Sequence, residues 1–371
     1  MWVANSLFSP LTLRSVVLPN RIAMSPMCQY MALDGVASAW HMAHLGARAI
    51  GGTGLITVEA TAVEPAGRLT LGCVGLWNDA QADALRPVTD FIRSQGSVSA
   101  VQLAHSGRKG ARTRPWEEGG RALRSDEGGW ELLAPSAIPF GDYAMPREMN
   151  AEDLEAVEAA FANAARLALR AGFDAINLHF AHGYLLHSFL SPLTNQRGDE
   201  YGGSLENRAR FPRRIVRAVR SAWPDHLPII VRLSCSDWAD GGFEIDEAIT
   251  VARWFAEDGA DLIDCSSSGL VDWEKVTTGL NYQVEFARRI GAETGLPTGA
   301  VGMIVDPAQA ENIISSGDAA LVFLGRALLD DPNWAHHAAD TLSTQNSWPL
   351  PYRRAVGRLK NIRALLPAEG H

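Results

Sequence analysis

The sequence predicts an α/β protein built as a single (β/α)8 TIM barrel. Three observations lead to this fold class: eight short apolar segments recur along the chain, helical patterns separate them, and no GxGxxG follows the first segment. Continuous apolar runs without strict alternation are typical of parallel strands buried on both faces. An open doubly wound sheet is the alternative, but the missing glycine pattern disfavours it. Eight strand–helix repeats therefore favour the barrel.

The expected strands follow one another at intervals that leave room for helices. They are Arg21–Met27, Gly54–Thr61, Val98–His105, Asp174–Phe180, Pro228–Cys235, Asp261–Ser268, Pro297–Ile304 and Ala319–Arg326. The clearest helix, Ala151–Gly172, has an acidic first turn and ends at a glycine. The patterns Glu244–Gly259 and Asp306–Gly317 end in the same way. These helices supply the connections that parallel strands require.

The longest interruption of the repeat, residues 106–150, comes after the third strand. It is rich in Gly, Pro, Arg and Trp and carries no long periodic pattern. We expect a capping loop or small subdomain over the barrel mouth, because loops of this length in compact domains are usually functional. The expected organisation is a barrel over residues 1–340, followed by a tail at 341–371.

Composition narrows the class of protein. The chain has 371 residues, is 47% hydrophobic and carries a net charge of −9, which is globular and disfavours a nucleic-acid binder. Its start lacks a signal-peptide pattern, and no apolar run is long enough to cross a bilayer. The four cysteines are far apart and form no CxxC pair. We therefore expect a cytoplasmic protein with free thiols.

The expected active site lies where the strands end, at the carboxyl-terminal face of the barrel. Barrels often bind phosphate with the loops after strands seven and eight. Here Gly302 and Gly325 would let backbone N–H groups approach an anion, and Arg326 could pair with it bidentately. The alternative is that both glycines only form turns.

Three histidines and a tyrosine follow strand four: His179, His182, Tyr184 and His187. A zinc site needs three or four ligands, and no HExxH pattern surrounds these residues. His179 and His182 could instead donate hydrogen bonds to one carbonyl oxygen, with Tyr184 delivering a proton to carbon. A structural histidine pair is the third interpretation. His187 falls in a helical turn, LLHSFL, and is expected to be packed or at the surface.

Several motifs, in order and spacing, resemble the Old Yellow Enzyme family of flavin-dependent ene-reductases. They are SPMCQY (25–30), QLAHSGRKG (102–110), HFAHGYLLHSFLSPLTNQRGDEYGGSLENRARF (179–211), GAVGMI (299–304) and FLGRALLDDP (323–332). The resemblance runs from Asn5 to at least Trp334. The cysteine at position 28 of SPMCQY is similar to that of the thermophilic-like, xenobiotic-reductase-like subclass. Members of this subclass have Cys where classical relatives have Thr.

The resemblance implies non-covalent FMN, with NADPH or NADH as the reductant. Hydride would pass through the flavin to the β-carbon of an activated alkene, with proton addition at the α-carbon. The partners implied are this small molecule and further copies of the chain, as a homodimer or higher homo-oligomer. No resident metal, nucleic acid or membrane is implied.

The resemblance also assigns roles to individual residues. Arg232 would place positive charge near flavin N1 and O2, where reduction adds negative charge. The residues implied to bind the cofactor are Ser25, Pro26, Met27, Cys28, Ala60, Gln102, Arg232, Gly302, Met303, Gly325 and Arg326. Those implied to bind substrate or act in catalysis are Cys28, Tyr30, Lys109, His179, His182 and Tyr184. Arg354, with Arg353 as runner-up, would reach a neighbouring subunit's site.

Some of these residues could have a purely structural role, and three other functions are alternatives to an ene-reductase. Cys28 and Tyr30 could be packed, and Gln102 and Arg232 could form a structural network. A metal-dependent hydrolase would use His179, His182 and a carboxylate. The dienoyl-CoA reductase branch of the superfamily would need a cysteine cluster after the barrel, which this sequence lacks. A non-catalytic FMN-binding protein would not need both histidines and Tyr184.

Overall fold

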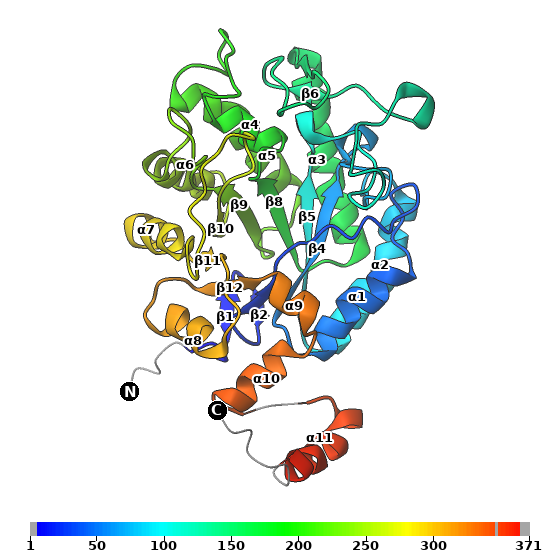
Figure 1. The fold of residues 1–371 in the computed structure, drawn as a ribbon, viewed down its shortest axis with the longest axis vertical. Coiled ribbons are helices and arrows are strands. Elements are labelled where there is room, and N and C mark those ends of the chain that lie inside the picture. Colours follow the sequence, from blue (N-terminus) through cyan, green and yellow to red (C-terminus); the bar gives the residue numbers. More distant parts are fainter. Residues whose placement is uncertain (1–5, 346–347, 364–371) are drawn as a thin grey trace.

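A closed barrel of eight parallel strands forms the centre of the structure, a computed structural model that describes residues 6–345 and 348–363 (Figure 1). In order around the barrel the strands are β3 (Ile22–Met24), β4 (Leu55–Ala62), β5 (Val98–Ala104), β8 (Ala175–Phe180), β9 (Ile229–Ser234), β10 (Leu262–Ser266), β11 (Thr298–Ala300) and β12 (Leu321–Leu324). The predicted fold class and all eight predicted strands are confirmed. Six of the strands are shorter at their carboxyl ends than expected.

The first strand shows why an end was misplaced. It was expected to reach Met27, but β3 stops at Met24. Ser25 N–H still donates to Leu324 O at 2.9 Å. Pro26 has no N–H to continue the ladder, so the chain leaves the sheet there. The residues from Pro26 to Tyr30 therefore lie on a loop at the barrel rim.

Helices surround the barrel, and the long predicted helix is confirmed. They are α1 (Ala39–Ile50), α2 (Asp79–Ser94), α3 (Ala151–Ala171), α4 (Leu185–Leu190), α5 (Leu205–Ala222), α6 (Ile245–Glu257), α7 (Val284–Thr294), α8 (Pro307–Ser315), α9 (Arg326–Asp330) and α10 (Trp334–Thr341). The Asn150 side chain accepts from Asp153 N–H at the start of α3. Gly172, with φ +85°, ends it in a left-handed conformation that glycine adopts without strain.

A short hairpin closes the amino-terminal end of the barrel. Its strands, β1 (Leu11–Leu13) and β2 (Val16–Leu18), pair antiparallel, and the sequence did not predict them. Leu13 and Leu18 pack with residues from the starts of the barrel strands, such as Leu55 and Val98. This apolar plug fills one end, so a site can open only at the carboxyl-terminal face.

The 106–150 insertion contains a small element of its own. Strands β6 (Leu133–Ala134) and β7 (Arg147–Glu148) form a two-stranded sheet, preceded in the chain by two short 3₁₀ turns. Trp116 from this insertion packs edge-on against Tyr30, with ring centroids 5.9 Å apart. The insertion therefore reaches the loop that follows β3.

The tail extends away from the barrel. Its helix α11 (Leu350–Arg363) lies beyond α10 in Figure 1, and Arg353 and Arg354 on it are exposed. Residues 346–347 and 364–371 of the predicted tail, and residues 1–5 of the predicted barrel domain, lie outside the described residues. Within the described part of the chain, no helix combines the length and apolarity needed to span a bilayer.

Candidate active site

A deep cleft of about 680 Å³ opens where the barrel strands end. Nine of the residues predicted to bind cofactor or substrate line it: Ser25, Pro26, Met27, His182, Arg232, Gly302, Met303, Gly325 and Arg326. They come from segments that follow β3, β8, β11 and β12 and from β9 itself. The volume falls in the range typical of ligand pockets. The topology has thus gathered residues up to about three hundred positions apart in the sequence.

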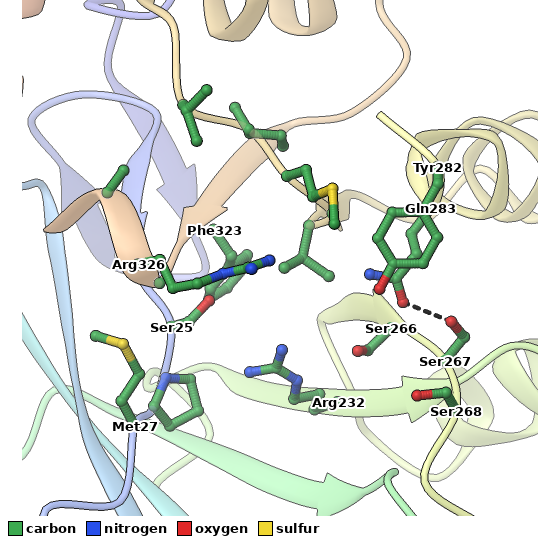
Figure 2. Close-up of a pocket in the computed structure, with 18 of the residues that line it drawn as sticks. Ser25, Met27, Arg232, Ser266, Ser267, Ser268, Tyr282, Gln283, Phe323 and Arg326 are labelled. Carbon is green, nitrogen blue, oxygen red and sulfur yellow. Dashed lines mark hydrogen bonds between the residues drawn. The ribbon is translucent and has the colours of Figure 1, made fainter. Parts of the chain in front are cut away.

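Two arginines dominate the charge of the cleft, and Figure 2 shows both side chains pointing into it. Arg326 forms no ion pair with any carboxylate in the part of the chain that the structure describes. Arg232 Nε lies 3.6 Å from Asp264 Oδ2 and has no hydrogen-bond partner among the described residues. Two arginines with unused donors make a strong site for an anionic ligand.

The backbone and walls of the cleft suit a flat ligand that carries a phosphate. Gly302 has φ +122°, and a Cβ there would lie 3.1 Å from Gln283 N, so only glycine fits without strain. Met27, Phe323 and Met303 supply apolar wall, while the buried Ser25 Oγ has no partner among the described residues. The residues present therefore fit a flavin nucleotide, with apolar sides, an unused hydroxyl and cationic groups.

His179, near the end of β8, forms one aromatic cluster with His182 and Tyr184, which follow the strand. The rings of His179 and His182 are 5.1 Å apart and nearly perpendicular, and those of His179 and Tyr184 are 4.9 Å apart. His182 Nε2 is 2.8 Å from Ser266 Oγ. His179 Nδ1 is buried without a partner among the described residues. Such an orphaned polar atom indicates a missing hydrogen-bond partner.

Burial sets the protonation state of this cluster. It lowers the pKa of both His179 and His182 well below the usual range, and the nearby Arg232 lowers them further. Both imidazoles are therefore neutral at neutral pH and can each donate one N–H. Burial, followed by the Cys28 sulfur, raises the pKa of Tyr184 above its usual value. Its hydroxyl stays protonated.

Lys109 lies beside the same cluster and is tied to backbone. Its Nζ donates to His182 O at 3.0 Å and to Gly269 O at 2.7 Å, and lies 5.4 Å from the centre of the Tyr184 ring. Burial, and then the charge of Arg108, lowers the pKa of Lys109 to about 8. In this structure Lys109 therefore holds the loop that carries His182.

In the wild type the free energy of unfolding is expected to increase at alkaline pH, and Lys109→Met is expected to abolish this increase. Because the folded pKa of about 8 lies below the ordinary 10.5, the unfolded chain binds more protons between these values. The wild-type free energy of unfolding should therefore increase as the pH rises through this window. Urea unfolding of both proteins at about pH 7.5 and about pH 9.5 checks this. An equal pH response in the two proteins would contradict it.

Cys28 and Tyr30 lie together on the loop after β3. Burial, and then the charge of Glu59, raises the pKa of Cys28 well above its usual value, although a hydrogen bond with Tyr30 opposes this. Burial likewise raises the pKa of Tyr30. Glu59 Oε2 accepts from Gln29 N–H at 2.9 Å and anchors the loop. Cys28 is thus a neutral thiol at physiological pH, which suits hydrogen bonding better than nucleophilic attack.

Cys28 is expected to react slowly with iodoacetamide at neutral pH, at least about tenfold more slowly than free cysteine, because the thiolate is the reacting form. Peptide mass spectrometry over a time course measures the rate. Cys235 and Cys265, which are buried and free, provide internal references within the same chain. Stoichiometric labelling of Cys28 within the first time point would show that its thiol is activated.

Ala60 and Gln102 stand beside the cleft without lining it. They pair across β4 and β5, and Gln102 Nε2 donates to Asn177 Oδ1 at 3.0 Å. Ala60 and Tyr184 line a smaller neighbouring pocket. Arg354 is on α11, which lies apart from the barrel, and does not line the cleft of its own chain.

Sequence reasoning missed the hydroxyl-rich wall of the cleft. Ser266, Ser267 and Ser268 line it, together with Tyr282 and Gln283 from the segment before α7. Ser267 Oγ donates to Gln283 Oε1 at 2.6 Å, drawn as a dashed line in Figure 2. The available signal was the run of serines at the end of the sixth predicted strand, since strand ends line a barrel's site.

These features define a barrel protein with a pocket for an anionic organic ligand at its carboxyl-terminal mouth. Comparison with known proteins identifies the family. Residues 6–345 match the NADH:flavin oxidoreductase / NADH oxidase family, and the chain belongs to this family. It is an NAD(P)H-dependent flavin oxidoreductase, a member of the Old Yellow Enzyme group predicted from the motifs.

The curated relatives have similar lengths. The chain is 45% identical over 355 residues to an NADPH dehydrogenase of Bacillus subtilis, covering 95% of this chain and 99% of the relative. It is 44% identical over 351 residues to an NADPH dehydrogenase of a Geobacillus species, covering 94% and 98% respectively. These alignments extend over nearly the whole barrel.

Solved structures share the fold at lower identity. Morphinone reductase in complex with tetrahydroNAD has a TM-score of 0.75 and 26% identity, with 93% of each chain covered. An old yellow enzyme homologue from Zymomonas mobilis has a TM-score of 0.75 and 25% identity, covering 92% of this chain and 94% of that chain.

Proposed function

We propose that the protein is an FMN-dependent ene-reductase. The observation that carries this is the cluster of two neutral imidazoles and a protonated tyrosine beside a cleft that fits a flavin nucleotide. When bound, FMN would supply hydride, taken from NADPH or NADH, for the β-carbon of an alkene conjugated to a carbonyl or nitro group. The substrate is thus a small activated alkene.

The cleft residues would bind and orient the cofactor. Arg326, with the backbone at Gly302 and Gly325, would hold the phosphate, and Arg232 would stabilise negative charge on the reduced ring. Ser25, Pro26, Met27 and Met303 line the cleft and would contact the cofactor. Cys28, Ala60 and Gln102 lie beside the cleft and would complete this contact. The unused donors of both arginines support these roles.

The histidine cluster would activate the alkene. His179 and His182 would donate N–H bonds to the carbonyl or nitro oxygen, stabilising the charge that develops there. Tyr184 would give its proton to the α-carbon, and Tyr30 would help to hold the oxygen. A raised tyrosine pKa favours a proton donor that is always loaded at neutral pH.

An anaerobic visible spectrum of the purified protein tests the proposal. We expect a yellow flavin band that bleaches with NADPH and returns when cyclohexenone is added. A flavin that bleaches but is not reoxidised by any enone, maleimide or nitroalkene would restrict the activity to NAD(P)H oxidation. A protein that neither contains nor takes up FMN would overturn the proposal.

Further parts of the proposal concern subclass and assembly. Cys28 supports the thermophilic-like, xenobiotic-reductase-like subclass, and Arg354 in a homo-oligomer would enter a neighbouring subunit's site. Exposed Arg354 on a helix that lies apart from the barrel is consistent with this role. An Arg354→Ala enzyme with unchanged substrate affinity and turnover would remove it. A barrel ending near residue 340 and a cytoplasmic location stay predictions.

The site supports a metal-dependent hydrolase less well than it supports a reductase. Among the described residues, no three His, Cys, Asp or Glu side chains are grouped as metal ligands. His182 Nε2 is bonded to Ser266, a neutral hydroxyl, and the positive charge of Arg232 nearby disfavours a cation.

A further inference from the structure

His187 is the histidine of the signature segment that the proposed mechanism does not use. It lies on α4 with no exposed side-chain surface and does not line the cleft. It therefore cannot touch a substrate. Both of its ring nitrogens are hydrogen-bonded, as buried polar groups generally are, and the partners identify what the ring holds in place.

The turn that joins His179 to Tyr184 is strained. His182 has φ +60° and Gly183 has φ +72°, so two consecutive residues adopt the left-handed conformation. For a non-glycine residue this conformation is unfavourable and persists only where the surroundings impose it. A Cβ at Gly183 would lie 2.1 Å from Gly269 O, so the turn also depends on glycine.

Side chains bond all four backbone polar groups of His182 and Gly183, the two strained residues of this turn. Ser234 Oγ accepts from His182 N–H at 3.0 Å, and Lys109 Nζ donates to His182 O at 3.0 Å. Ser188 Oγ donates to Gly183 O at 3.1 Å, and His187 Nδ1 accepts from Gly183 N–H at 2.9 Å. His182 and Gly183 are therefore held by side chains from β9, α4 and the segment of Lys109, and not by the backbone ladder of a helix or strand.

Asp237 determines which nitrogen of His187 carries the proton. Because Nδ1 accepts from Gly183, the ring hydrogen must be on Nε2, which lies 2.9 Å from Asp237 Oδ1. Asp237 is fully buried, and its Oδ2 accepts from Ser191 Oγ and Phe243 N–H, both at 2.6 Å. The carboxylate thus fixes both the tautomer and the orientation of the ring.

We propose that His187, oriented by Asp237, is a positioning residue that fixes the turn carrying His182 and Tyr184. The functional consequence rests on the proposed function, because it is there that His182 binds the substrate oxygen and Tyr184 donates a proton. Loosening Gly183 would lower the fraction of molecules with both groups in place, and ligand affinity falls with that fraction.

Two nearly isosteric variants separate the two hydrogen bonds. In His187→Asn, the amide oxygen takes the place of Nδ1 and can still accept from Gly183. In His187→Gln, the amide nitrogen takes the place of Nε2 and can still donate to Asp237. Phe189→Leu on the same helix is the control. Phe189 packs against Phe211, so its replacement should lower the stability of the fold without removing a hydrogen bond of the turn. His187→Leu removes both bonds.

Hydrogen exchange of the Gly183 amide in the holoenzyme tests the positioning role directly. Loss of one buried hydrogen bond should accelerate exchange about tenfold in His187→Gln and His187→Leu. His187→Asn and Phe189→Leu should exchange within about threefold of the wild type. Unchanged protection in His187→Gln would overturn the inference, even if His187→Leu fails to fold. Equal acceleration in Phe189→Leu would also overturn it, because it would reveal a general loss of stability.

Titration of each holoenzyme with 4-hydroxybenzaldehyde, followed by flavin absorbance, tests the consequence. His187→Gln should bind the phenol about tenfold more weakly, and His187→Asn should recover most of the affinity. If the wild type binds no phenol, the proposed function fails while the exchange result still decides the role of His187. If the wild type binds it and His187→Gln binds equally well, the inference about His187 fails.

Discussion

Replacing His179 and His182 together with alanine is expected to reduce enone turnover by at least about 10²–10³-fold, the effect of removing one oxyanion donor or more. The two rings lie 5.1 Å apart and are both neutral, so each carries one N–H, which in the proposed mechanism is donated to the substrate oxygen. Alanine supplies no donor, and charge developing on that oxygen would be left unpaired. Reduction of the flavin by NADPH should change less than enone turnover does.

Stopped-flow kinetics that separate the two half-reactions measure this difference. His226→Ala is the control, because it removes an exposed histidine outside the cleft. The double variant should also lose affinity for 4-hydroxybenzaldehyde while keeping its FMN. Tight phenol binding in the double variant would show that the histidines do not form the oxygen site.

Arg232→Met is expected to make the reduction potential of the flavin more negative by at least about 30 mV, which corresponds to a tenfold change in a two-electron equilibrium. The guanidinium faces the cleft, and its positive charge would stabilise the electron-rich reduced ring. The change also leaves Asp264 without its cationic neighbour. Breaking a buried pair in this way typically costs about 3–5 kcal/mol.

Asp264 allows the two effects to be separated. Burial already raises the pKa of its carboxyl, so it can take up a proton when Arg232 is removed, which limits the loss. Arg232→Met with Asp264→Asn should recover much of the stability, but the potential should stay low. Arg166→Met, which removes an exposed charge on α3, is the control. A wild-type potential in Arg232→Met would place the arginine's role in folding alone.

Several site predictions were possible because of the barrel's symmetry. Parallel strands that form a closed barrel place all their carboxyl ends at one rim. The sequence could therefore predict that Ser25, His182, Arg232 and Gly302 lie close together. Their convergence in one cleft is confirmed, whereas their individual roles stay predictions. The positions of strand ends were less accurate, as Pro26 shows, because one missing N–H ends a ladder that hydropathy would extend.

His187 shows the limit of the pattern. Its place in LLHSFL predicted a packed or surface residue, and burial without exposed surface confirms packing. The sequence could not identify Asp237 as its partner, because the two residues lie 50 positions apart, one on α4 and the other on the loop after β9. The run of serines at the end of the sixth strand could have marked the wall around Ser266, but the partners of these hydroxyls depend on what packs against them.

The sequence by itself determined the order of the strands, the family and the residue types at the barrel rim, because these depend on local hydrophobic pattern and on motif spacing. Only the tertiary structure decided the protonation states and the hydrogen-bond partners. Burial lowers the pKa of His179, and Asp264 lies beside Arg232, through contacts between distant segments. Desolvation and Coulomb interactions depend on distance in space, which the linear order of residues does not contain.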